Sequence, residues 1–419
     1  MWGKEFAVKC IIDNQVVLLR SPEGPLSAHI ASFAKWVRSQ GYAADSTHRM
    51  ILLAVCFSRW LGHKRVGLRD ITRGHVARYL RYRARYAQPR AGDAAALMYL
   101  LEHLHTASVI PVEKTSIPQL TPAERCAQGY EQYLRETRAL AEATVINYVP
   151  FIRDFLRGRY RDGRVALSRL RARDVVRFVR QQAARLKPKR AKLMTSALRS
   201  FLQYARLRGE VTLDLAAAVP IVANWSMPSI PRAIAPEQTQ QLLASIDRRT
   251  AIGRRDFAIV LLLARLGLRS SEVVSLDLDD LDWNAGQLRV RGKSGQRGEL
   301  PLPAPVGKAI ANYLRRGRPD SISRRVFLRA KAPIRGFRGP SAIASIVRHS
   351  IQRAGVDAPT YGAHQFRHGL ATEMLRHGAS LAEIGEVLGH RHPQTTTIYT
   401  KVDIKALRAL ALPWPVGAR

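Results

Sequence analysis

The chain of 419 residues has few cysteines, few acidic residues and no long apolar run. Its three cysteines, Cys10, Cys56 and Cys126, lie far apart, which excludes a disulfide framework and shows no metal-ligand spacing. No stretch approaches the ~20 apolar residues that a membrane span needs. The first residues lack the basic start and apolar run of a signal peptide. We therefore expect a cytoplasmic protein of a reducing compartment, with no membrane partner.

The scarcity of acidic residues leaves a large excess of positive charge. The 68 Lys and Arg residues outnumber the 32 Asp and Glu residues and give a net charge of +36. A polyanion relieves self-repulsion of this size, so the composition predicts a nucleic acid as a partner. A general bias towards arginine and alanine explains part of the arginine count but not a pI near 11.2. Neither an acidic cluster with ligand spacing nor a glycine-rich phosphate loop is present, so no metal or small-molecule cofactor is expected.

The length allows two or three domains, and the 46% of hydrophobic residues is enough to fill their cores. Helical spacing of apolar residues predicts a helical module over 1–115 and a second one over 116–216. The proline-rich segment 217–235 is predicted to be a linker. Mixed helix and strand patterns then predict a domain over 236–419.

The two helical modules are similar in sequence. Residues 33–38 match 130–135, and residues 71–80 match 170–179, at offsets of 97 and 99 residues. This similarity favours an internal duplication of a four-helix module. The alternative is that two pairs of amphipathic helices of similar length look alike by chance.

Polar residues suited to phosphodiester chemistry gather in the C-terminal part. His364 and Arg367 are three residues apart, so a helix places both on one face. His390 follows Leu388-Gly389, Tyr399 comes nine residues later, and Arg269 stands upstream in Gly267-Leu-Arg-Ser-Ser-Glu272. Each of these features alone is weak evidence for a catalytic site, since a surface His and Arg pair or a packed tyrosine is common in proteins. Two arginines, two histidines and a tyrosine together form a set that can hold a phosphodiester and attack it.

Four stretches carry a resemblance to a known family: 264–276, 290–302, 364–372 and 388–400. In the order and spacing of these stretches the chain resembles the tyrosine recombinases, or phage integrase family, over about 235–405. Residues 121–216 more loosely resemble the core-DNA-binding domain of that family. The resemblance implies a mainly α, multidomain protein. Its all-α N-terminal DNA-binding modules would precede an α+β catalytic domain with a small antiparallel sheet.

The resemblance also implies roles for individual residues. Arg269 and Arg367 would hold the non-bridging oxygens of the scissile phosphate, because guanidinium donates two parallel hydrogen bonds to an oxyanion. Glu272 would hold an arginine in place. His390 would donate a hydrogen bond to the phosphate.

The remaining implied roles concern proton transfer and covalent attack. Tyr399 would be the nucleophile and would form a 3′-phosphotyrosine link. His364 would accept the phenolic proton, and Lys293 would protonate the leaving 5′-oxygen. Arg291 stands close to Lys293 and competes for that last assignment. DNA contacts outside the catalytic set are expected on the second helical module, at Lys189, Lys192 and Arg199.

One position departs from the family pattern. His368 is followed by Gly369, where the family more often has threonine or serine. We interpret this position as one of packing, so the departure does not affect the chemistry.

Three functions fit the catalytic set. The first is a site-specific recombinase, acting as a homo- or hetero-tetramer on DNA. The second is a type IB topoisomerase, which uses the same side chains without a partner protomer. The third is a DNA-binding regulator that kept the fold without the activity, which the complete catalytic set disfavours. The additional N-terminal module favours the integrase or transposase of a mobile element.

Overall fold

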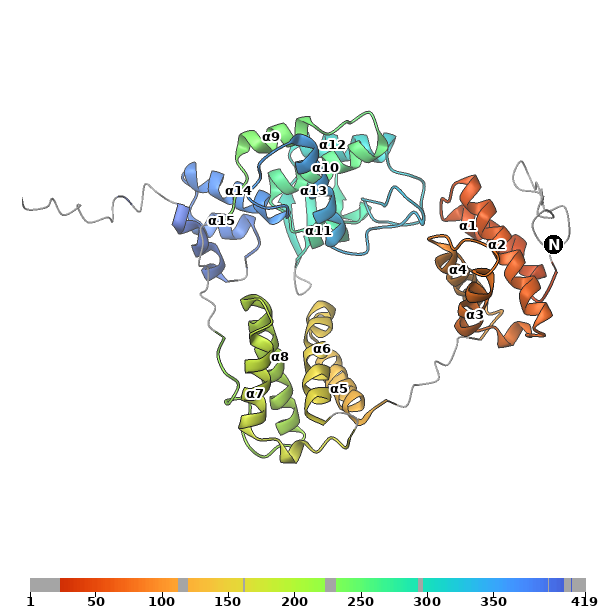
Figure 1. Ribbon diagram of the computed structural model, residues 1–419. Helices are drawn as coiled ribbons and strands as arrows, with labels where there is room; N and C mark the ends of the chain where they lie inside the picture. The colour runs from red at the N-terminus through yellow and green to blue at the C-terminus, as the bar shows by residue number, and fades with distance from the viewer. Residues whose placement is uncertain are drawn as a thin grey trace, which may run out of the picture. The chain divides into compact units, whose positions relative to one another are not determined.

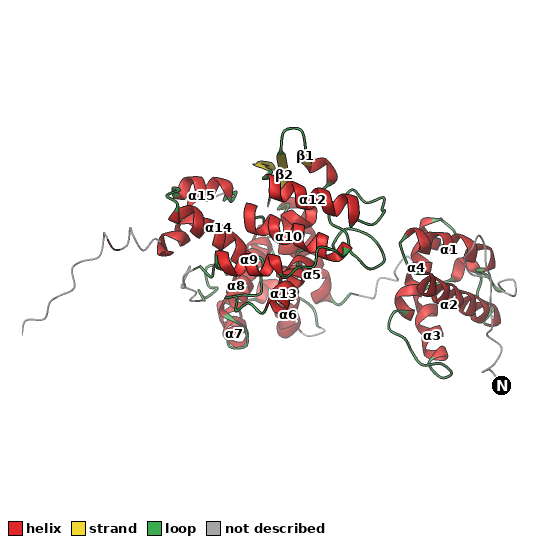
Figure 2. Ribbon diagram, turned by 90° about the horizontal axis from the view of Figure 1, so that it is seen from above, coloured by secondary structure: helices red, strands yellow, loops and turns green. Residues whose placement is uncertain are grey.

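The computed structural model describes residues 23–111, 120–160, 163–222, 231–292, 297–390, 392–402 and 408. Its architecture is mainly helical, with one small sheet in the C-terminal part (Figure 2). This confirms the predicted fold class. Backbone contacts group residues 1–113 with 230–419 and set 114–229 apart as a second unit.

The N-terminal module is a helical bundle around its own apolar core. Phe33 and Val37, four residues apart on the first helix, are both fully buried in that core. The chain leaves the bundle after Ile110, which is also buried. Its elements are η1 (Ser27–His29), α1 (Ile30–Ser39), α2 (Ala44–His63), η2 (Leu68–Asp70), α3 (Arg73–Arg83) and α4 (Asp93–Thr106).

The second unit is also a helical bundle, in which α7 packs beside α8 (Figure 1). Its first helix begins with a capping box, since Glu124 N–H donates to Thr121 Oγ1 and Thr121 N–H donates to Glu124 Oε2. Its elements are α5 (Pro122–Gln132), the π-helix η3 (Tyr133–Thr137), α6 (Glu142–Tyr160), η4 (Leu167–Arg169), α7 (Ala172–Ala183) and α8 (Pro188–Leu207).

The two bundles repeat the same order of elements. The helices α2 and α6 begin 98 residues apart, and both the η2–η4 and the α3–α7 pairs begin 99 residues apart. Buried positions repeat at the same interval, as Val76 with Val175 and Ile71 with Leu170 show. This repetition supports the inferred duplication and gives each residue of α3 a matching position in α7.

The C-terminal part is built around α10 (Ala251–Leu266), whose residues 258–263 are all buried. A helix that is apolar all round belongs inside a core, and α10 packs against both α12 and α14. The other elements before the sheet are α9 (Pro236–Ala244), α11 (Ser270–Ser275) and η5 (Leu278–Asp280). Those after it are α12 (Ala304–Arg316), α13 (Ser341–Ala354), α14 (His364–Arg376), α15 (Leu381–Val387) and η7 (Pro393–Val402).

The sheet has three antiparallel strands in the order β1 (Leu281–Asp282), β2 (Gln287–Arg291) and β3 (Arg297–Pro301). Val290 pairs with Gly298 next to the turn between β2 and β3. Lys293 belongs to that turn and lies outside the described residues.

A small separate cluster holds η7 against α14 and α15. Ala371, Ile384, Leu388 and Tyr399 are its buried members. The cluster fixes where η7 lies, and therefore where Tyr399 lies. Among the described helices, none has the length and hydropathy needed to cross a membrane.

Candidate active site

Arg269 stands at the turn between α10 and α11. Gly267 makes this turn with a φ of +60°, and a Cβ at Gly267 would lie within 3.0 Å of side-chain atoms of both Leu388 and Leu370. Arg269 Nη1 donates to Glu272 Oε1 at 2.6 Å, and its backbone N–H donates to Glu272 Oε2 at 2.7 Å. Glu272 is buried, as expected of a residue that holds an arginine in place.

Arg367 is buried, although it carries a charge. Its Nη1 donates to the carbonyl oxygen of Gly267 at 2.9 Å, and its Nη2 donates to the carbonyl oxygen of Leu388. Burial and the nearby charge of Arg269 lower the pKa of Arg367 to about 10. The guanidinium remains charged at neutral pH. Among the described residues no carboxylate forms an ion pair with Arg367, so an anion would stabilise its charge.

The two arginines line one cleft of about 530 Å³. Arg269, Arg367 and His390 line it together, although Arg269 and Arg367 are nearly 100 residues apart in sequence. Gly292 and Gly298, on either side of the residues that are not described, also line the cleft. The cleft brings together three of the six predicted catalytic residues.

His390 follows Gly389, whose φ of +59° turns the chain at the end of α15. His390 Nδ1 lies 2.8 Å from Thr396 Oγ1, which fixes the ring. Burial, followed by the charges of Arg367 and Arg269, lowers the pKa of His390 to about 4. The imidazole is therefore neutral at pH 7 in the free protein.

Tyr399 is only 1% exposed, and it does not line the cleft. Its phenolic oxygen lies 3.1 Å from His368 Nδ1, and the two rings meet edge to face at 5.8 Å. Burial raises the pKa of Tyr399, and the charge of Arg367 opposes that effect. The phenol is therefore protonated at neutral pH and needs an acceptor before it can attack.

His368 contacts the phenol, and sequence reasoning gave it no role. Burial, followed by His364 and Arg367, lowers the pKa of His368, so its imidazole is neutral at pH 7. His364, the acceptor predicted from the sequence, is exposed, and its ring lies 6.4 Å from that of His368. The spacing of four residues, which places both histidines on one helix face, was the signal available in the sequence.

Gly369 shows why the chain departs from the family pattern there. A Cβ at this position would lie 3.0 Å from the carbonyl oxygen of Ile234. The segment before α9 therefore passes close to α14, and a larger residue at 369 would push it away. The departure is one of packing.

Two family models match this chain, and both come from the same family. The model of the Phage integrase family matches residues 232–405, and the model of the Phage integrase N-terminal SAM-like domain matches 127–209. The integrase/recombinase y4rA of Sinorhizobium fredii is 58% identical over 98% of this chain and 100% of its own length. The chain belongs to the phage integrase family.

Further similarities in sequence and in fold support the assignment of the chain to this family. The tyrosine recombinase XerD of Mycobacterium tuberculosis is 31% identical over 67% of this chain and 94% of its own length. The fold is similar to that of XerH recombinase bound to its difH substrate, with a TM-score of 0.55 and 18% identity over 74% of this chain and 92% of that one. A lambda integrase dimer bound to a core site gives a TM-score of 0.51 with 16% identity over 66% and 94% of the two chains.

The DNA contacts predicted on the SAM-like domain fall on α8 of this family member. Lys189 and Lys192 are exposed there. Arg199 is half-buried, and its Nη2 donates to the carbonyl oxygens of Val219 at 2.9 Å and Pro220 at 3.2 Å. Arg199 therefore anchors the chain that follows α8, while the two lysines remain the candidates for phosphate contacts.

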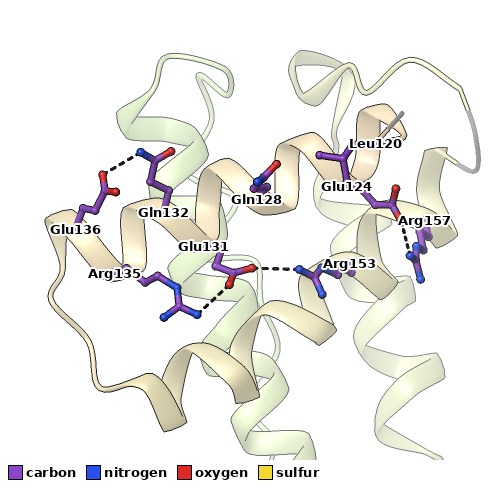
Figure 3. A pocket seen from close by; sticks show the side chains of 9 residues that line it. All are labelled: Leu120, Glu124, Gln128, Glu131, Gln132, Arg135, Glu136, Arg153 and Arg157. Atoms are coloured by element: carbon purple, nitrogen blue, oxygen red, sulfur yellow. Dashed lines mark hydrogen bonds and ion pairs between the residues drawn. The ribbon is translucent and has the colours of Figure 1, made fainter. Parts of the chain in front are cut away.

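The SAM-like domain also has a cleft in which charges are balanced (Figure 3). Glu131 lies between Arg135 and Arg153, at 3.0 and 3.1 Å. Glu124 accepts from Arg157 at 2.7 Å, and this hydrogen bond is the main cause of its lowered pKa. Three arginines and three glutamates line this cleft, so it offers a phosphate no excess positive charge and serves as an internal control for DNA binding.

Proposed function

We propose that this chain is a site-specific tyrosine recombinase of a mobile element, acting as its integrase or transposase. It cleaves and rejoins double-stranded DNA through a 3′-phosphotyrosine at Tyr399. The observation that carries the proposal is the cleft in which Arg269, Arg367 and His390 meet. Arg269 is paired with Glu272 there, whereas Arg367 donates to carbonyl oxygens and, among the described residues, to no carboxylate, so its charge fits a phosphodiester better than a neutral ligand.

The arginines act on the scissile phosphate as a clamp. Arg269 and Arg367 donate to its non-bridging oxygens, and their fixed charge stabilises the additional negative charge of the pentacoordinate transition state. The contacts of Arg367 with two carbonyl oxygens hold the guanidinium in place before DNA arrives. His390 adds a hydrogen bond to the same phosphate.

Tyr399 supplies the nucleophile. Its oxygen bonds to phosphorus while the bond from phosphorus to the 5′-oxygen breaks, and Lys293 gives that leaving oxygen a proton. The phenolic proton passes to the histidine pair on α14, where His368 is in contact and His364 is one helical turn away. The phosphotyrosine keeps the energy of the original bond, so rejoining needs no nucleotide.

Because Tyr399 is buried in the free protein, attack requires η7 to move towards the cleft. Binding energy from DNA contacts is the source of that rearrangement. The cost of exposing Tyr399 would keep the nucleophile inactive away from DNA.

Two protomers on each of two DNA sites would form the active tetramer, in the cytoplasm. A similar structure, a lambda integrase tetramer bound to a Holliday junction, supports this assembly for the fold. The experiment that tests the function sequences the DNA ends attached to protein trapped during turnover in cells. A recombinase gives one recurrent sequence, whereas a topoisomerase gives scattered ends and a non-catalytic regulator gives none.

A further inference from the structure

The surface at the end of α3 combines exposed aromatic rings with unpaired positive charge. Tyr82 is 42% exposed and Tyr86 is 69% exposed, and their ring centroids are 5.3 Å apart. Tyr82 also contacts Trp60 on α2, at 6.4 Å between centroids. Trp60 in turn packs on the buried rings of Phe57 and Tyr79. The two tyrosines are therefore the outer end of a row of rings that starts in the core.

Three arginines lie close to this pair of tyrosines in the sequence, and Arg78, Arg81 and Arg85 are all exposed. In the part of the chain that the structure describes, none of the three forms an ion pair with a carboxylate. The neighbouring Arg83 differs, because it is paired with Asp93 at 2.5 Å. The end of α3 and the turn after it therefore carry uncompensated positive charge as well as the two exposed rings.

The second bundle provides a comparison because it repeats the same elements. At the interval of 99 residues, Arg78 and Arg81 match Arg177 and Arg180, so these charges occur in both bundles. Tyr82 and Tyr86 match Gln181 and Arg185. At the interval of 98 residues that separates α2 from α6, Trp60 matches Gly158. The inner rings Phe57 and Tyr79 match Phe155 and Phe178, which also pack together. Only the outer rings are particular to the first bundle, so basic charge for a DNA backbone does not explain them.

We propose that Tyr82 and Tyr86, with Arg78, Arg81 and Arg85, form a binding site for unpaired DNA bases. An exposed tyrosine ring stacks on the face of a base, and every base has such a face. In a duplex those faces are covered by neighbouring base pairs, so tyrosines gain little there. Arginines beside the rings attract the phosphates of the same strand. The ligand is thus a short single-stranded DNA segment, and the site is separate from the catalytic cleft.

The test uses the full-length chain carrying Tyr399→Phe, so that no strand is cut. Fluorescence anisotropy measures the affinity for a labelled dT oligonucleotide and for a duplex of the same length, both at one fixed salt concentration. We expect Tyr82→Gln with Tyr86→Ala to weaken binding of the single strand at least ~10-fold and binding of the duplex less than ~2-fold. Tyr82→Phe with Tyr86→Phe should keep single-strand affinity, because the ring faces remain.

Two further variants separate this site from general charge and from misfolding. Arg69→Gln removes one exposed charge from η2, at the other end of α3, and should weaken both ligands equally. Tyr86→Ala alone removes the more exposed ring, which lies farther from the core, and should still weaken the single strand several-fold. Photo-cross-linking of an iodouracil oligonucleotide, followed by peptide mapping, should place the adduct on the peptide that contains both tyrosines.

Two outcomes would overturn the proposal. One is wild-type affinity for the single strand in the variant without both rings. The other is an equal loss for single strand and duplex, which would make the patch an ordinary backbone contact. Neither outcome depends on strand cleavage, so this test and the test of the recombinase chemistry fail independently.

Discussion

His368 Nδ1 lies 3.1 Å from the phenolic oxygen of Tyr399. The contact joins the first turns of α14 to η7 across 31 residues of sequence, and it places a neutral imidazole beside a protonated phenol. A neutral imidazole can accept the phenolic proton, while a charged one cannot. The nucleophile and its nearest acceptor are therefore in contact before DNA binds.

The role of His368 can be tested by substitution. His368→Ala should slow formation of the covalent adduct by roughly 10²-fold, the lower end of what general bases contribute. His368→Gln can still hold the phenol by a hydrogen bond but cannot take its proton, so it should be nearly as slow. The measurement is the rate of adduct formation on a nicked substrate under single-turnover conditions. Wild-type rates in His368→Ala, with a strong loss in His364→Ala, would assign the proton to His364 instead.

The low pKa of His390 predicts proton uptake when DNA binds. Burial and the two arginines hold this pKa at about 4 in the free protein, and a bound phosphate opposes the charge of those arginines. The pKa of His390 is therefore higher in the complex, so the complex binds more protons than the free protein. Affinity should rise as pH falls from about 6.5 towards 4, because uptake on binding favours the complex in acid.

Calorimetry in buffers of different ionisation heat measures this uptake directly at about pH 5.5, between the free-protein and ordinary histidine pKa values. The background is Tyr399→Phe, which keeps the DNA intact. His390→Gln should lower the number of protons taken up, since it removes the titrating ring. Equal uptake with and without His390 would show that the phosphate does not reach it.

If the two arginines act as a clamp, a positive charge at position 367 is not sufficient for DNA cleavage. Arg367→Lys keeps a cation but loses the planar fork that donates to Gly267 and Leu388 and to the phosphate. Cleavage should fall at least ~10²-fold, while DNA binding falls much less. Glu272→Gln should cause a smaller loss, because it loosens Arg269 without removing it. Single-turnover cleavage and equilibrium binding, measured on the same substrate, check both, and an undiminished rate in Arg367→Lys would refute the clamp.

The exposed lysines of α8 predict a change in salt response. Lys189→Gln with Lys192→Gln should make the slope of log K against log salt shallower, by roughly one unit for each phosphate that the protein no longer neutralises. Arg153→Gln is the matched control, since Arg153 is already paired with Glu131. Binding to duplex DNA at several salt concentrations measures the slopes. An unchanged slope in the lysine variant would place the duplex elsewhere on the domain.

Much of the fold follows from local patterns in the sequence. The helices of the predicted modules 1–115 and 116–216 are present, because apolar residues recur there at helical spacing. The short α11 has six residues, which carry too little periodicity for a helix pattern of their own. The catalytic set came from motif order, and its two arginines and His390 do meet in one cleft.

Other features of the candidate site and of the SAM-like domain depend on tertiary structure and could not be predicted from the sequence. Neither the burial of Tyr399 nor its contact with His368 can be deduced from spacing, because both depend on how η7 packs against α14. The structural role of Arg199 likewise depends on where the chain after α8 returns. Lys293 stays a prediction from the resemblance.

The central claim is that Tyr399 becomes covalently joined to DNA. A suicide substrate, nicked next to the scissile phosphate so that the leaving strand diffuses away, traps that link. The wild-type chain should give a band that withstands denaturation, and peptide mapping should place the DNA on Tyr399. Tyr399→Phe should bind the same substrate with unchanged affinity and give no adduct. A covalent adduct that persists in Tyr399→Phe, or one mapped to another residue, would contradict the account.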